Sequence, residues 1–322
     1  MSRKSLDREI KMSEEHPIIA VTGASGAGTT VVQQAFKEIF YRQSINAAFV
    51  QGDGFLRYSD VDTEKHIINS QSLNKPVSCY GPDLNDFDRL EGCFSRYTQS
   101  GTGTCRIKVN GENSHLYTES EGSFTDWQEI EAGTDCLFYE GMHGGVVAKT
   151  WTRRKCENSE AFKKDRRSSR TKGVDVAQYV DLLIGVAPAI NLEWIQRIHH
   201  DRVIRKLAPG RVTDNILEQL QDYIHFIVPQ FSISDINFQR MPMVDTSNPF
   251  DTQPVPTEKE SMVVISFKNP AEHDFKHYIR RIDGAFLSRR SCIVIPGGQL
   301  QHALDVICAP LIERLIERKK EK

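Results

Sequence analysis

Short apolar runs alternate with helix-forming stretches along the first two thirds of the chain. Four runs rich in β-branched or aromatic residues predict buried strands at Pro17–Thr22, Ala47–Val50, Cys136–Tyr139 and Val180–Val186. Each run is followed by a glycine, an acidic residue or a helix-forming stretch. Strands that alternate with helices predict βαβ units in a mostly parallel sheet, which binds ligands at the carboxyl ends of its strands.

The remaining pattern extends this sheet. Further strands are predicted at Met241–Val244, Met262–Phe267 and Cys292–Ile295, and the polar, turn-rich segment Gly101–Trp127 is typical of a hairpin. A closing helix is predicted at Gln299–Arg318, because one face carries apolar residues at spacings of three and four, namely Leu304, Ile307, Leu311 and Leu315. We therefore expect an α/β fold with a mixed, mostly parallel sheet flanked by helices.

Composition narrows the class of protein. The 322 residues carry a net charge of −2 with a pI near 6.6, which does not favour nucleic acid or anionic membranes as partners. No apolar run approaches the roughly 20 residues of a membrane span. The seven cysteines are scattered and form no C-x-x-C pair, which predicts reduced thiols in a cytoplasmic protein rather than a zinc site or disulfides.

Two segments differ from the rest in charge. Residues 1–15 are charged and lack the apolar core of a signal peptide, so we expect a flexible tail followed by one domain over residues 16–322. Lys149–Lys172 has ten Lys or Arg against three Asp or Glu, which predicts a solvated basic loop. A patch that binds an acidic partner or a polyphosphate is the alternative interpretation.

A glycine-rich turn follows the first predicted strand and leads into a helix at Val31–Phe40. The turn comprises Gly23, Ala24, Ser25, Gly26, Ala27, Gly28, Thr29 and Thr30. Glycines let the backbone wrap an anion, and the helix start supplies N–H groups and a favourable dipole. The usual pattern is G-x-x-x-x-G-K-[ST], with lysine on the β/γ-phosphates and the hydroxyl on Mg²⁺. Thr29 replaces the lysine and Thr30 keeps the hydroxyl, so the turn predicts a triphosphate site whose cation comes from elsewhere.

Two carboxylates follow strands that should end at the same edge. Asp53 comes just after the Ala47–Val50 strand, and Glu140 just after the Cys136–Tyr139 strand. This edge suits a general base for an acceptor hydroxyl, here Asp53, and a carboxylate near Mg²⁺, here Glu140. Each carboxylate could instead cap a neighbouring helix or turn.

Basic residues gather on a predicted helix at Asn191–Lys206, with Asn191 as its N-cap. Arg197, Asp201, Arg202 and Arg205 follow steps of three and four, which gathers much of the charge along one side, so the helix could supply the missing cation. A solvated basic face without a functional role is the alternative interpretation.

The sequence resembles the bacterial type of phosphoribulokinase. The segments that carry the resemblance span almost the whole chain and include VTGASGAGTT, GDGF, YGPDLNDF, FTDW, LFYEGMHGGVV, NLEWIQRIHHDR and VPQFSISDINFQRMPMVDTSNPF. The resemblance implies a P-loop kinase fold, Mg²⁺ and ATP, ribulose 5-phosphate as the small-molecule acceptor, and a homo-oligomer. It implies Asp53, Arg197 and Arg202 as catalytic residues, the loop Gly23–Thr30 on ATP, and Thr30 with Glu140 on the metal. Arg57, His200 and Arg205 would bind the acceptor.

Several positions depart from the family pattern. Leu56 stands in place of a histidine, Asp60 of an arginine, Arg197 of a lysine, His200 of an arginine and Asn110 of a histidine, and Lys149–Lys172 resembles an insertion. Asp60 is expected to repel an acceptor phosphate, and Arg197 changes the shape of the cation. These departures leave two alternatives open: a kinase for another phosphorylated sugar, or a nucleotide-binding regulatory protein with reduced catalysis. A GTPase-like switch is disfavoured because Asn74-Lys75-Pro76-Val77 lacks the aspartate that recognises guanine.

Overall fold

The computed structural model describes residues 15–23, 29–72, 77–147, 174–203, 208–250 and 254–320. The side chains of Thr29 and Thr30 are outside this description. So are three of the predicted features: the phosphate-loop residues Ala24–Gly28, the basic loop Lys149–Lys172 and Arg205. The predicted tail also lies outside it, apart from its last residue.

An eight-stranded sheet runs through the centre of the fold, in the order β2-β5-β1-β6-β7-β8-β10-β9. Neighbours from β2 to β7 are parallel, and β7, β8, β10 and β9 pair antiparallel. The strands are β1 Ile18–Gly23, β2 Ala47–Gln51, β5 Cys136–Gly141, β6 Leu182–Pro188, β7 Ile236–Pro242, β8 Ser261–Phe267, β9 Phe286–Arg289 and β10 Cys292–Pro296. This confirms the predicted mixed, mostly parallel sheet.

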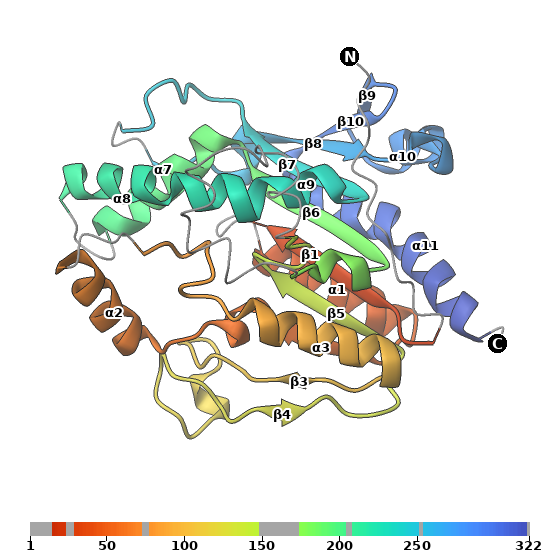
Figure 1. Cartoon of the computed structure of the whole chain (residues 1–322). Helices are drawn as coiled ribbons and strands as arrows, with labels where there is room; N and C mark the ends of the chain where they lie inside the picture. The colour runs from red at the N-terminus through yellow and green to blue at the C-terminus, as the bar shows by residue number, and fades with distance from the viewer. Residues whose placement is uncertain are drawn as a thin grey trace, which may run out of the picture.

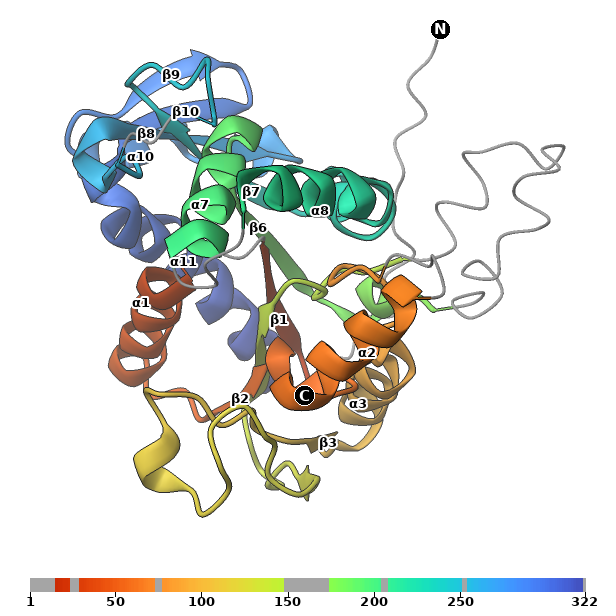
Figure 2. The same ribbon diagram turned by 90° about the vertical axis from the view of Figure 1, so that its left-hand side faces the viewer.

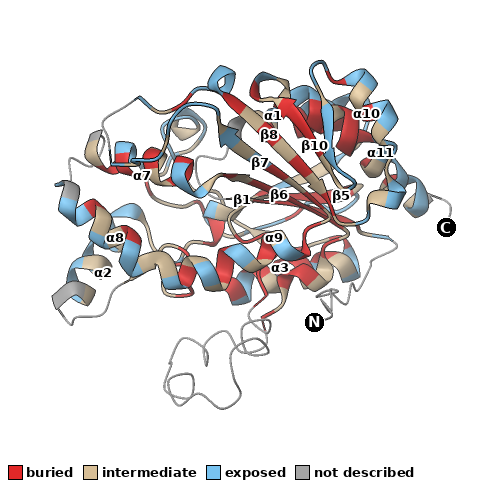
Figure 3. Cartoon of the chain, turned by 90° about the horizontal axis from the view of Figure 1, so that it is seen from above, coloured by how far each residue is buried: buried red, intermediate tan, exposed pale blue. Residues whose placement is uncertain are grey.

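Helices cover both faces of the sheet (Figure 1). They are α1 Thr29–Arg42, α2 Asp60–Ser72, α3 Phe87–Ser100, α7 Ile190–Val203, α8 Pro209–Asp222, α9 Val228–Ile233, α10 Phe275–Arg281 and α11 Leu300–Lys320. A π-helical turn, Tyr223–Ile227, joins α8 to α9. Seen from above, α1 and α11 lie on one side of the buried strands, and α3 and α9 lie on the other (Figure 3).

The alternation of side chains along β1 explains these two layers. Ile19 and Val21 join the core under α1 and α11, whereas Ile18 and Ala20 join the core under α3. Successive side chains of a strand point to opposite faces of the sheet. A strand that is buried on both faces therefore has a continuous apolar run in its sequence. The predicted closing helix is confirmed as α11.

The segment that was predicted to form a hairpin leaves the main sheet below α3. Its strands β3, Thr104–Cys105, and β4, Gln128–Glu129, pair antiparallel, and an isolated bridge joins Lys108 to Phe124. The preceding helix α3 ends at Gly101, whose φ of 65° is left-handed and favours glycine. The prediction of a hairpin is confirmed.

Two local predictions are wrong. The strand expected at Met241–Val244 is β7, which begins earlier, at Ile236, because its buried residues alternate with polar ones and form no apolar run. The helix expected to be capped by Asn191 begins at Ile190, since the amide of Glu193 already donates to the carbonyl of Ala189 at 2.9 Å. Asn191 lies inside the helix and donates from Nδ2 to the carbonyl of Thr246.

Two negative findings concern the described ranges only. Their six cysteines are free thiols, with Cys156 outside the described part. No described helix combines the length and the apolar character that crossing a membrane requires.

Candidate active site

Parallel strands β2, β5, β1 and β6 end at one edge of the sheet. Glu140 near the end of β5 pairs with Val21 of β1 on one side and with Gln51 of β2 on the other. A 3₁₀ turn, η1 (Gly52–Phe55), follows β2 at once and carries Asp53. Figure 2 looks onto this edge, which α2, α7 and α8 surround. The topology therefore brings Asp53 and Glu140 to the same end of neighbouring strands, as predicted.

A direct backbone contact between two glycines joins the carboxylate-bearing segments. A Cβ on Gly52 would lie 2.9 Å from the Cα of Gly141, and a Cβ on Gly141 would lie 2.7 Å from the Cα of Gly52. Real Cβ atoms do not approach a backbone so closely, so a side chain at either position would push the segments apart. Because Asp53 follows Gly52 and Glu140 precedes Gly141, this contact sets the approach of the two carboxylates.

The electrostatics of this pair are unusual. Burial and, to a lesser extent, the negative charge of Asp53 raise the pKa of Glu140 to about 7, against an opposing effect of Lys37. Asp53 is exposed, and its carboxylate has no hydrogen-bond or ion-pair partner in the described part of the chain. Ionising Glu140 beside Asp53 is unfavourable, and a cation would offset the negative charge. The two carboxylates therefore favour a cation between or beside them.

These residues fit Mg²⁺ better than a metal held by protein alone. No group of three or more His, Cys, Asp or Glu side chains that could hold a metal occurs among the described residues. Mg²⁺ usually takes only one or two carboxylates and completes its shell with water and phosphate oxygens. Glu140, with Thr30 and a bound triphosphate, would supply such a shell.

The start of the predicted phosphate loop lies against β6. A Cβ on Gly23 would lie 2.3 Å from the carbonyl oxygen of Val186, so only glycine fits the end of β1 there. Six residues later the chain enters α1 at Thr29. A helix N-terminus just beyond a parallel strand is a ready site for phosphate, because its first N–H groups have no partner within the helix.

Helix α7 carries two of the predicted cations, Arg197 and Arg202, and Arg197 is already engaged. Arg197 donates from Nη1 to the hydroxyl of Tyr80 at 2.9 Å and from Nη2 to Oε1 of Gln219 at 2.5 Å. Arg202 makes no hydrogen bond or ion pair within the described residues. His200 is exposed, and its Nδ1 lies 3.2 Å from Oδ1 of Asp201.

Asp60 begins α2 and does not carry an isolated charge. Its Oδ1 accepts from Nζ of Lys108 at 2.6 Å, and its amide donates to the carbonyl of Gly122 at 2.9 Å. The ammonium-bearing side chain is 19% exposed and the carboxylate side chain 61%. The expected repulsion of an acceptor phosphate is therefore reduced, because the hairpin supplies a compensating cation that the local sequence pattern did not indicate.

Two further positions, Arg57 and Asn110, are exposed, and each forms hydrogen bonds with nearby backbone groups. Arg57 donates from Nε to the carbonyl of Pro82 at 2.8 Å, and its Nη1 lies 3.4 Å from Oδ2 of Asp86. Asn110 uses Oδ1 to accept from the amides of Glu112 and Asn113, so it holds its own turn.

Sequence reasoning missed a buried glutamine that connects three elements. Gln230 of α9 accepts from the hydroxyl of Thr22 at 2.6 Å and from the amide of Gly145 at 2.8 Å. It donates to the carbonyls of Met142 at 2.9 Å and Phe226 at 2.6 Å. Thus α9, the end of β1 and the turn after Glu140 share one hydrogen-bonded centre. In the sequence, the only signal is its place in the segment VPQFSISDINFQRMPMVDTSNPF, which assigns it no role.

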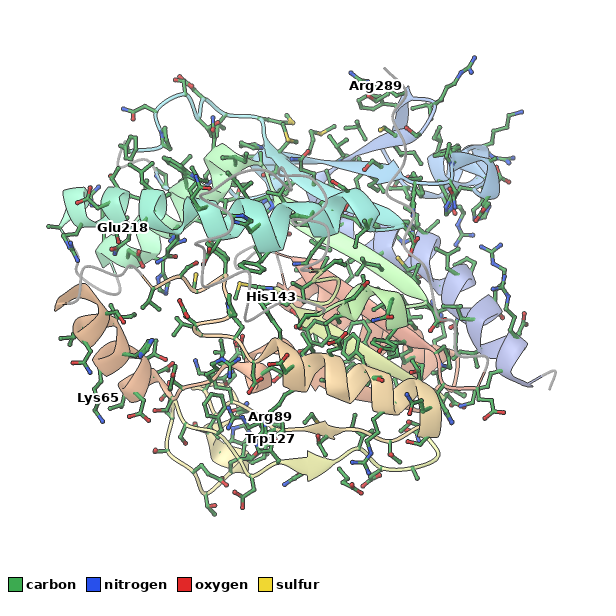
Figure 4. The ribbon with its side chains drawn as sticks, in the orientation of Figure 1. Lys65, Arg89, Trp127, His143, Glu218 and Arg289 are labelled. Carbon is green, nitrogen blue, oxygen red and sulfur yellow. The ribbon has the colours of Figure 1, made fainter. Side chains whose placement is uncertain are left out.

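His143 lies in the same turn and faces the interior (Figure 4). Neither ring nitrogen has a hydrogen-bond partner in the described structure, and the ring meets Phe87 edge to face at 4.8 Å. Burial lowers the pKa of His143 to about 3, so this side chain is neutral. Its ring packs inside the turn, and it adds no charge at the edge of the sheet where Asp53 and Glu140 lie.

Comparison with known proteins gives one consistent result. The model of the phosphoribulokinase/uridine kinase family matches residues 18–247. Phosphoribulokinases from Nitrobacter vulgaris and Xanthobacter flavus are 45% and 44% identical over 311 and 312 residues, which cover 96% of this chain and 99% of each relative. The structure of phosphoribulokinase from Rhodobacter spheroides superimposes with a TM-score of 0.80 at 40% identity, covering 96% of this chain and all of that one. The resemblance is therefore confirmed, and this chain belongs to the phosphoribulokinase/uridine kinase family.

Proposed function

We propose that this protein is a kinase that uses ATP to phosphorylate ribulose 5-phosphate, yielding ribulose 1,5-bisphosphate. The observation that carries the proposal is similarity over nearly the full length to proteins named phosphoribulokinase. The meeting of Asp53 and Glu140 beside the start of the phosphate loop supports it, since both groups suit phosphoryl transfer.

The nucleotide side of the proposal uses the glycine-rich turn. Gly23, Ala24, Ser25, Gly26, Ala27, Gly28, Thr29 and Thr30 hold the triphosphate of ATP. The Thr30 hydroxyl and the Glu140 carboxylate would hold Mg²⁺, which would reduce the negative charge on the transferring phosphate. The raised pKa of Glu140 supports this role, because a cation would favour its ionised form.

The acceptor side uses Asp53 as general base. Its carboxylate takes the proton of the acceptor hydroxyl while the oxygen of that hydroxyl bonds to the γ-phosphorus. The bond from phosphorus to the bridging oxygen breaks, and ADP leaves. Arg197 and Arg202 offset charge on the transferring group, with Tyr80 and Gln219 fixing the guanidinium of Arg197. Arg57, His200 and Arg205 contact the acceptor phosphate. One domain over residues 16–322 and a homo-oligomer complete the proposal.

A different phosphorylated sugar is the second candidate acceptor. Leu56 and the Asp60–Lys108 ion pair favour it, since both alter the polar groups that follow Asp53 along the chain.

An ADP-release assay across pentose and hexose phosphates tests the function. We expect ribulose 5-phosphate to give the highest kcat/KM, and Asp53→Asn to lower kcat by about 10²–10⁴-fold with ATP affinity retained. Asp88→Asn, an exposed carboxylate in the first turn of α3, is the matched control and should leave kcat unchanged. ATP binding by calorimetry without ADP release on any acceptor would instead support a regulatory protein.

A further inference from the structure

Arg106, which follows β3 in the hairpin, reaches the turn that carries Asp53. Its Nε donates to the carbonyl of Gly54 at 2.9 Å, and its Nη2 donates to the carbonyl of Leu56 at 2.5 Å. Both carbonyls belong to or directly follow η1. One side chain from about 50 residues away in sequence therefore satisfies two acceptors of this turn.

Aromatic rings hold the guanidinium in place. Its central carbon lies 3.7 Å from the ring centroid of Phe124 and 4.6 Å from that of Trp127. Arg89 approaches the same tryptophan at 4.3 Å, and Figure 4 shows these two side chains together above the hairpin. Burial and then Arg89 lower the pKa of Arg106, with Asp86 opposing, but an arginine remains charged in proteins.

The turn and the hairpin also touch through their backbones. A Cβ on Gly54 would lie 2.0 Å from the carbonyl oxygen of Arg106, so the glycine is needed for this approach. On the other side, the carbonyl of Phe55 accepts from the amide of Asp86 at 2.8 Å. The backbone of the turn is thus held from two directions, and on the hairpin side one guanidinium donates the hydrogen bonds to the carbonyls of Gly54 and Leu56.

We propose that Arg106 is a positioning residue for the Asp53 carboxylate, and this rests on the proposed function. Because the carboxylate has no hydrogen-bond or ion-pair partner in the described part of the chain, the backbone of η1 sets its place and direction. Arg106 orders that backbone, with its planar donors matched to two carbonyls. Loss of the guanidinium would displace the base relative to the acceptor hydroxyl while leaving the phosphate loop in place.

Three variants of the full chain test this. Arg106→Met should lower kcat about 10²-fold, as expected for a base displaced by about 1 Å, with KM for ATP within about threefold of the starting protein. Arg106→Lys keeps the charge but not the planar set of donors. Its kcat should therefore lie between that of Arg106→Met and that of the starting protein. Arg96 of α3 forms an exposed ion pair with Glu129 of the hairpin. Arg96→Met removes this ion pair and should change neither kcat nor the KM for ATP.

A second measurement does not depend on catalysis. The amides of Leu56 and Arg57 donate to the carbonyls of Asp53 and Leu84, and in Arg106→Met their hydrogen exchange should accelerate at least about tenfold. The amide of Leu137 in β5 should not change and reports that the sheet remains folded. Unchanged exchange at Leu56 and Arg57, or faster exchange with kcat unaltered, would overturn the proposal. A starting protein that phosphorylates no sugar would refute the proposed function instead. The hydrogen-exchange measurement alone would then decide whether Arg106 orders η1.

Discussion

At the scale of single residues, the candidate site places two carboxylates, Asp53 and Glu140, close together. Glu140 lies on β5 between β1 and β2, and its burial and the neighbouring Asp53 favour its protonated form and raise its pKa to about 7. Such an arrangement costs stability without a ligand, because folding brings together charges that water separates in the unfolded chain. Function and stability therefore oppose each other at this residue.

Glu140→Gln should stabilise the ligand-free protein in a pH-dependent way. The folded pKa is about 7 against 4.5 in the unfolded chain, so the native state binds more protons between these values, and stability falls as pH rises through that window. The destabilisation by Glu140 is absent below pH 4.5 and fully developed above about 7, with an upper bound of about 3 kcal/mol.

Urea unfolding at pH 5 and pH 8 measures this difference. The gain in unfolding free energy from Glu140→Gln should be larger at pH 8, while the exposed Glu112→Gln should show the same small effect at both. An equal gain for Glu140→Gln at the two pH values would contradict burial and the charge of Asp53 as the cause of the raised pKa.

At the scale of elements, the site depends on contacts between segments distant in sequence. The hairpin supports η1, and the π-helical turn before α9 delivers Gln230 to the end of β1 and to the turn after Glu140. π-Helical turns interrupt regular helices at a cost and are frequent near functional sites. In this protein the π-helical turn precedes α9, from which Gln230 contacts both the end of β1 and the turn after Glu140.

Gln230→Leu should destabilise the protein by about 2–5 kcal/mol, because it leaves several buried backbone groups without a partner. Gln230 is 1% exposed, so water cannot replace the lost amide. Gln34→Leu on the exposed face of α1 is the control and should change the unfolding free energy by less than about 0.5 kcal/mol. A Gln230→Leu variant as stable as the control in urea would show that the amide is dispensable.

At the scale of the whole molecule, one continuous eight-stranded sheet joins the parallel and antiparallel strands, and β3 and β4 of the hairpin pair separately. The five parallel strands carry the candidate site, and the antiparallel strands β8, β10 and β9 extend the sheet away from it. The core under α1 and α11 includes residues from both parts, among them Ile19 of β1 and Ile293 of β10. This continuity supports one cooperative domain.

Unfolding should therefore follow a single transition. Circular dichroism reports the helices, and in a Trp151→Phe variant fluorescence reports only Trp127 in the hairpin and Trp194 in α7, so coincident urea midpoints from both probes are expected. A fluorescence transition that precedes loss of helical signal would indicate that the hairpin or α7 unfolds separately, and would argue against a single domain over residues 16–322.

Part of this protein could be predicted from local pattern, because some features need only neighbouring residues. The apolar runs identified β1, β2, β5, β6, β8 and β10, and the residues after them identified Asp53 and Glu140. The position of β7 could not be predicted from an apolar run, since its polar residues alternate with buried ones. The pairing of Lys108 with Asp60 and the engagement of Arg197 by Tyr80 and Gln219 join positions too far apart in the chain for any spacing rule.

The sequence alone determined the class of fold, the family, the glycine-rich turn and the two acidic positions, because each depends on short motifs or on the period of buried residues. Only the tertiary structure decided that Gly52 and Gly141 touch, that Asp60 is neutralised, and that Arg106 and Gln230 hold the segments around the site. These contacts arise from packing between elements that the chain brings together on folding. A hydrogen bond or an ion pair over such a separation leaves no periodic trace in the sequence.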